Sequence, residues 1–119
     1  MSYYTILQLS WDDSDYPKGN IGAQDVVTAA AAHVTRSGWH IDALKDLEAA
    51  ASAGFGNHAP GFRNIHGFAL VRMLQDVSRV LPQITFFARG IGEEFDDLWL
   101  VQIRAGEIQK KSGPFADDL

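Results

Sequence analysis

The stretch that decides the fold is residues 83–113, which read QITFFARGIGEEFDDLWLVQIRAGEIQKKSG. It contains three runs rich in aromatic and β-branched residues, and connections that carry glycine separate these runs. Such a pattern is typical of a small antiparallel meander. We therefore predict strands over residues 84–89, 97–104 and 107–111.

The chain before residue 83 supplies one more strand and the helices. A largely apolar run with partial alternation predicts a strand over residues 3–11. Apolar residues recur at helical spacing over 22–37, 42–53 and 65–80, which predicts three helices. Residues 39–41 fit either the connection before the second helix or a short edge strand, and the sequence leaves both interpretations open.

These elements follow one another in the order β-α-α-α-β-β-β, which indicates an α+β fold. We expect one domain over residues 1–119, with a mixed or antiparallel four-stranded sheet, helices on one face and a loosely held tail over 113–119. The side chains that we expect to be mostly buried are Ile6, Leu7, Val27, Leu44, Leu47, Phe68, Leu74, Val77, Ile84, Phe86, Trp99 and Val101.

Composition narrows the class of protein. The 119 residues include no cysteine, which excludes disulfides, thiolate metal sites and cysteine nucleophiles. The formal net charge is −5, and this argues against direct nucleic-acid binding, which requires a basic surface. No apolar run approaches the ~20 residues that span a bilayer, and no basic, apolar leader opens the chain. We expect a cytoplasmic protein without membrane contact.

Carboxylates gather at two places in the chain. The first cluster contains Asp12, Asp13 and Asp15, and the second contains Glu93, Glu94, Asp96 and Asp97. If the strands over 3–11 and 84–89 were parallel, both clusters would lie at one edge of the sheet and form an acidic rim. An antiparallel pairing would put the clusters at opposite ends.

Three interpretations of these acidic loops are open. They are a solvated face, a docking surface for a protein partner with a basic surface, or a divalent-cation site. The spacing does not match an EF-hand loop, which counts against the cation site. Phe95 lies between Glu94 and Asp96, so its ring is either an interface anchor or a lid on the core.

Other motifs that carry chemistry are weak. Four carboxylates, rather than a helix, follow Gly90 and Gly92, which argues against a phosphate-binding loop. No pair of histidines has the i, i+4 spacing of metal ligands, although His58 and His66 could meet. No serine lies in a nucleophile-elbow context. We therefore predict no catalytic residue, no metal and no cofactor.

The sequence favours a non-enzymatic protein that binds, and inhibits or neutralises, a macromolecular partner. Small, acidic, cysteine-free domains occur among toxin-immunity proteins and inhibitors carried by phages and other mobile elements, and this analogy rests on size and charge alone. The predicted partner-binding residues are the two acidic clusters together with Phe95. The alternative is a ligand-binding or enzymatic domain with a pocket between helices and sheet near Phe55–Asn64. The oligomeric state is left open.

Overall fold

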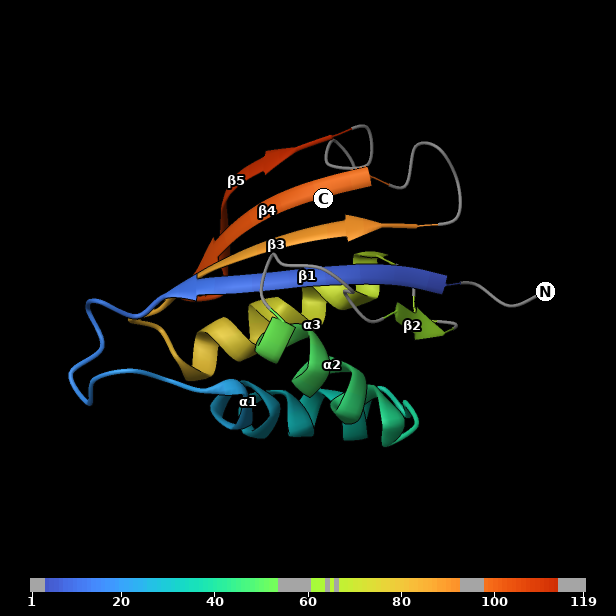
Figure 1. Ribbon diagram of the computed structural model, residues 1–119, viewed down its shortest axis with the longest axis horizontal. Helices are drawn as coiled ribbons and strands as arrows, with labels where there is room; N and C mark the ends of the chain where they lie inside the picture. The colour runs from blue at the N-terminus through green and yellow to red at the C-terminus, as the bar shows by residue number, and fades with distance from the viewer. Residues whose placement is uncertain (1–3, 54–60, 64, 66, 93–97, 114–119) are drawn as a thin grey trace.

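The computed structural model describes residues 4–53, 61–63, 65, 67–92 and 98–113. Within these ranges the chain forms three helices and five strands (Figure 1). Their bounds are β1 (Tyr4–Asp12), α1 (Ala23–Arg36), α2 (Asp42–Ala53), β2 (Gly61–Arg63), α3 (Gly67–Val80), β3 (Thr85–Ile91), β4 (Leu98–Arg104) and β5 (Glu107–Ser112). The predicted α+β class and the order of the long elements are confirmed. The three-residue strand β2 is an addition within a segment that was expected to be irregular.

All strands join one antiparallel sheet. Its spatial order is β2-β1-β3-β4-β5, so β1 lies inside the sheet between β2 and β3. Along β1 and β3 the register runs from Asp12 opposite Thr85 to Ile6 opposite Ile91. The parallel pairing that would join the two acidic clusters is therefore wrong. Its physical cause is the path of α3, which ends beside the end of β1, so that β3 begins there and runs back (Figure 1).

The helices cover one face of the sheet. Among them, α2 packs on β1 and β2, α3 packs on β3 and β4, and α1 packs against α2 and α3 (Figure 1). The helix α1 ends at Arg36, and the chain turns two residues later at Gly38, whose φ of +70° lies in the left-handed region that glycine adopts without strain. Residues 39–41 form the connection to α2, and the edge-strand interpretation is wrong.

The core lies between the helices and the sheet. Buried members of the predicted core are Leu7, Val27, Leu47, Leu74, Val77, Ile84, Phe86, Trp99 and Val101. Leu44 and Phe68 are only partly buried and pack at its margin. Ile6 was predicted to be mostly buried, and this prediction is wrong, because successive side chains of a strand point to opposite faces of the sheet. Leu7 faces the helices, so Ile6 faces the other way.

The turn between β4 and β5 is tied to α3. Gly106 N–H donates to Ser78 Oγ at 2.8 Å, and Gln75 Nε2 donates to the Gly106 carbonyl oxygen at 3.0 Å. The two central residues of this turn, Ala105 and Gly106, have φ values of 52° and 81°. Two positive φ values in succession define a type I′ turn, whose twist suits a β-hairpin. These contacts hold one face of the β4–β5 hairpin against α3, and the opposite face of the hairpin points away from the helices.

Candidate binding surface

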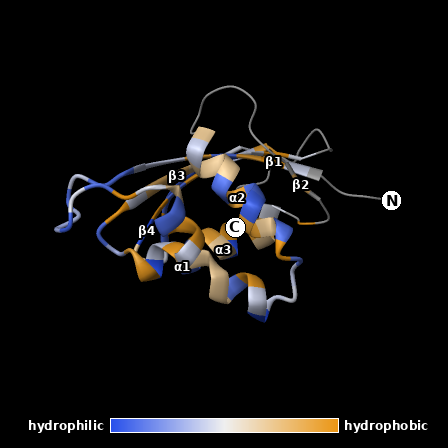
Figure 2. Cartoon of the chain, turned by 60° about the horizontal axis from the view of Figure 1, so that its bottom comes forward, coloured by the Kyte–Doolittle hydropathy of each residue, from blue (hydrophilic) through white to orange (hydrophobic). Residues whose placement is uncertain are grey.

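The first acidic cluster has structural partners. Ser14 N–H donates to Asp12 Oδ1 at 3.0 Å, and Ile21 N–H donates to Asp13 Oδ2 at 2.9 Å. Asp15 Oδ2 accepts from Arg104 Nη1 at 3.1 Å. The hydrogen bonds from the backbone and side chain of Ser14 hold the pKa of Asp12 below its usual value. The three carboxylates therefore shape the loop that follows β1, which projects from one end of the molecule (Figure 2).

The second acidic cluster, Glu93, Glu94, Asp96 and Asp97, lies outside the described residues, as does Phe95. The structure does describe Ile91 and Leu98, which lie on either side of this cluster in the sequence. Ile91 pairs with Ile6 on one side and with Leu98 on the other, at the end of the sheet opposite Asp12. The described residues that flank the second cluster therefore lie at the opposite end of the sheet from Asp12.

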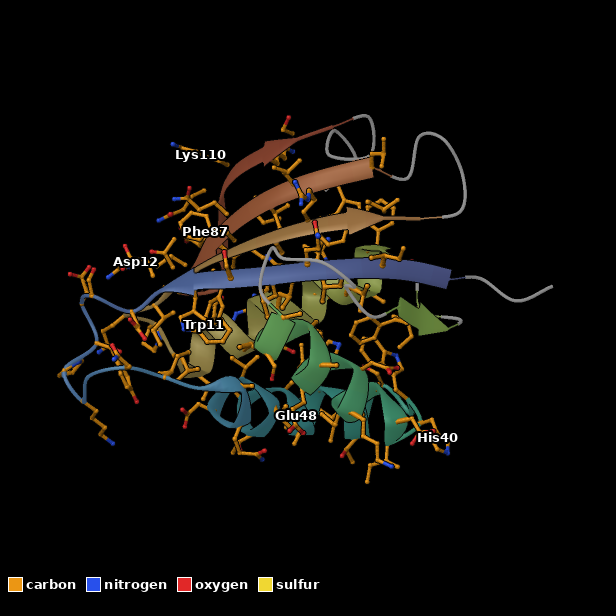
Figure 3. The ribbon with its side chains drawn as sticks, viewed as in Figure 1. Trp11, Asp12, His40, Glu48, Phe87 and Lys110 are labelled. Carbon is orange, nitrogen blue, oxygen red and sulfur yellow. The ribbon has the colours of Figure 1, made fainter. Side chains whose placement is uncertain are left out.

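One face of the sheet points away from the helices, and we call it the open face. Register and alternation place its side chains in rows across the strands. From the Asp12 end, the rows are Asp12, Thr85, Arg104 and Glu107; then Ser10, Phe87, Gln102 and Lys110; then Gln8, Arg89, Leu100 and Ser112; and finally Ile6, Ile91 and Leu98. Figure 3 shows Phe87 on this side of the sheet and Trp11 on the helix side. The rows therefore pass from an ionic end to an aliphatic one.

The last row, Ile6, Ile91 and Leu98, is the apolar end of the open face. Ile91 is 40% exposed and Leu98 is 39% exposed, although the two residues pair with each other across β3 and β4. Arg89, two residues back along β3, donates a hydrogen bond to Gln8 Oε1, which keeps its side chain along the sheet. The apolar end thus offers adjoining aliphatic groups to a partner.

A second feature of the open face is a depression of about 520 Å³ across β3, β4 and β5, which we call the hollow. Its lining is mostly apolar, and it comprises Phe87, Ala88, Leu100, Val101, Gln102, Lys110, Lys111 and Ser112. A β-bulge between Gln102 and Ile103 lies at its margin. Bulges bend a strand and increase its twist, which turns β5 relative to β4.

The other sites considered from sequence are placed as follows. Most of the segment Phe55–Asn64, where the alternative pocket was expected, lies outside the described residues. His58 and His66 also lie outside them. Among the residues that are described, no three His, Asp or Glu side chains gather as a metal ion would require. No described helix has both the length and the apolarity to cross a membrane.

Asp76 is the centre of a charged cluster that joins α3 to α1. His33 Nδ1 donates to Asp76 Oδ2 at 2.6 Å, and Arg36 Nη2 donates to the same oxygen at 2.9 Å. Arg79 Nη1 donates to the second carboxylate oxygen. The Trp39 ring packs edge-on against His33, with 5.2 Å between ring centroids. The sequence identified neither contact of Asp76 with α1, because its position in α3 predicts only a water-facing side chain.

We expect the substitution Asp76→Asn to lower the free energy of unfolding by about 1–2 kcal/mol at neutral pH. Partial burial raises the pKa of Asp76, but hydrogen bonds from His33 and Arg79 lower it by more, so it lies below the ordinary value of 3.8. A carboxyl with a depressed folded-state pKa stabilises the protein above its unfolded-state pKa. That stabilisation is lost as pH falls through the folded-state value.

Urea unfolding of wild type and Asp76→Asn at about pH 5 and about pH 2.5 checks this expectation. The difference between the two proteins narrows at the lower pH, because the carboxyl of the unfolded wild-type chain, with its ordinary pKa of 3.8, is then protonated and the lowered folded-state pKa contributes less stability. Glu48→Gln, at an exposed position on α2, is the control and stays within about 0.5 kcal/mol of wild type. A difference that is the same at both pH values would show that the charge of Asp76 does not stabilise the fold.

Comparison with known proteins finds no matching family model, no similar curated protein and no similar solved structure. The functional argument therefore depends on the surface itself.

Proposed function

We propose that this chain is a non-enzymatic protein that binds a protein partner with a basic surface, and that it inhibits or neutralises that partner. The observation that supports the proposal is the apolar end of the open face, where Ile91 and Leu98 are exposed. These two residues directly flank the stretch that carries Glu93, Glu94, Asp96 and Asp97. Aliphatic groups and a concentrated negative charge therefore adjoin along the chain.

Each half of this surface has a distinct task in binding. Protein interfaces combine a desolvated apolar centre with a polar rim, and the centre supplies most of the binding energy. Ile6, Ile91 and Leu98 are suited to the centre, and Phe95 supplies an aromatic anchor next to them in sequence. Carboxylates at the rim attract a basic partner before contact and raise the association rate. Asp12, Asp13 and Asp15 are not part of this surface, because they lie at the other end of the sheet.

The first test of the proposal compares two double charge reversals that give the same net charge. One variant is Glu93→Lys with Glu94→Lys, and its control is Asp42→Lys with Glu48→Lys on α2, on the helix side of the molecule (Figure 3). A partner captured from an extract of the native source is purified, and its association rate with each variant is measured at low and moderate salt. We expect the first variant to associate about tenfold more slowly at low salt, and its control less than about twofold more slowly.

A second variant tests the apolar half. The double substitution Ile91→Thr with Leu98→Thr removes aliphatic surface, and threonine is a β-branched residue that strands accept well. We expect its dissociation rate to rise by about tenfold or more, with a smaller change in the association rate. Equal association rates for the two charge-reversed proteins, or an unchanged dissociation rate for the threonine variant, would show that the partner binds elsewhere. Thermal unfolding of all variants excludes loss of fold as the cause.

A further inference from the structure

We propose that the hollow on the open face is a binding site for an amphipathic anion, of which a medium-chain carboxylate is the simplest member. The hollow is separate from the apolar end, because its lining contains neither Ile91 nor Leu98. Among the described residues, the lining combines an apolar floor with lysine, amide and hydroxyl side chains and includes no carboxylate. An occupant with one apolar portion and one negative charge matches both parts.

The floor of the hollow follows from the register of three strands. Phe87 on β3 pairs with Gln102 on β4, which pairs with Lys110 on β5. In the next row Leu100 pairs with Ser112. Leu100 is 47% exposed, so its side chain presents apolar surface to solvent. An aromatic ring and an isobutyl group thus lie beside an ammonium group and a hydroxyl.

Charge decides between an anionic and a cationic occupant. The chain as a whole carries a net charge of −5, yet no acidic residue is among the described residues that line the hollow. Lys111 pairs with Val101, whose side chain faces the helices, so Lys110 carries the positive charge on the open face. The side chain of Lys110 is exposed at the rim, on the open face (Figure 3). Gln102 Nε2 donates one hydrogen bond to Gln109 Oε1 at 2.8 Å, and the amide group has a second N–H to offer. A carboxylate at this rim would accept from Lys110 and from such neutral donors.

The size of the hollow sets the size of the ligand. Its volume of about 520 Å³ lies within the range of roughly 300–1,000 Å³ that is usual for small-molecule sites. The hollow is open on one side, so a ligand keeps part of its surface in water. Weak binding is expected as a result, because only the buried part of an apolar chain contributes its transfer free energy. Decanoate, used below its micelle concentration, is a suitable probe.

The test measures decanoate binding to the full chain by amide chemical shifts in ¹⁵N-labelled protein. Decyltrimethylammonium, with the same alkyl chain and the opposite charge, is the matched ligand control. We expect saturable shifts in residues 87–88, 100–102 and 110–112, with decanoate binding about fivefold or more tightly than the cation. Shifts centred on other residues, or equal binding of the two ligands, would overturn the proposal.

Two variant pairs locate the interaction. Lys110→Glu is compared with Lys45→Glu, an exposed lysine on α2, so that both variants have the same net charge. Leu100→Asp is compared with Ile41→Asp, which replaces a side chain that is 67% exposed outside the sheet. We expect Lys110→Glu and Leu100→Asp each to weaken decanoate binding about fivefold or more, and both controls to leave it within about twofold of wild type. Equal effects of the paired variants would show that decanoate does not occupy the hollow. The outcome is independent of the proposed protein partner, because neither variant alters Ile91, Leu98 or the acidic stretch between them.

Discussion

Replacing Gly90 with alanine is expected to lower the free energy of unfolding by about 3–5 kcal/mol. Gly90 on β3 pairs with Trp99 on β4, and the indole lies across the glycine. A Cβ atom at position 90 would lie 2.0 Å from Trp99 Cε2 and 2.2 Å from Trp99 Cζ2. Since Trp99 is only 1% exposed, the ring has no room to retreat without leaving its packing site. The added methyl group therefore displaces one of the largest side chains of the core.

Urea unfolding followed by tryptophan fluorescence measures this effect. Gly22→Ala is the control, because a Cβ atom at position 22 meets nothing within 4 Å, and its cost stays near or below about 1 kcal/mol. Combining Gly90→Ala with Trp99→Val is expected to destabilise the protein by less than the sum of the two single effects, because the valine leaves space for the new methyl group. A Gly90→Ala protein as stable as wild type would show that the indole does not lie over the glycine.

Truncating Leu74 to alanine is the second substitution with a large expected effect, a loss of about 2–5 kcal/mol in the free energy of unfolding. Leu74 lies in the middle of α3 and is fully buried. Its side chain belongs to the cluster in which α3 packs on the sheet, and the removed atoms leave a cavity that the surrounding elements fill only in part.

Val80 provides the matched control on the same helix. It is the last residue of α3 and is 60% exposed, so Val80→Ala is expected to change stability by no more than about 0.5 kcal/mol. Both proteins are compared with wild type by urea unfolding at neutral pH. Similar losses for the two variants would show that the buried face of α3 has been assigned to the wrong residues.

Periodicity predicted the elements well, because local patterns determine them. The apolar spacing in 65–80 and the glycine-bearing connections after residue 89 each indicate one kind of element. Pairing direction is different. Whether β3 runs parallel or antiparallel to β1 depends on the end of the sheet at which α3 finishes, which is set by how the helices pack on the sheet. No local pattern records that path, so the prediction of a shared acidic rim failed.

The open face could have been recognised in part. The run from Leu98 to Val101 is apolar at all four positions, yet helices were expected on only one face of the sheet. Alternation then requires two of these side chains, Leu98 and Leu100, to face away from the helices. The hollow could not have been recognised, because the place of Lys110 beside Gln102 depends on register, and the bulge after Gln102 shifts that register.

The position of β1 inside the sheet has a consequence for biosynthesis. Both strands that pair with β1 come later in the chain, since β2 begins at Gly61 and β3 begins at Thr85. The ribosome releases the N-terminal strand first, so the hydrogen-bonding edges of β1 and its apolar side chains Leu7 and Leu9 emerge before either partner exists. Pairing between strands that are so far apart in the sequence is also slow. We therefore expect nascent chains that end before β3 to be the species that aggregates. We expect chaperones to bind these same chains.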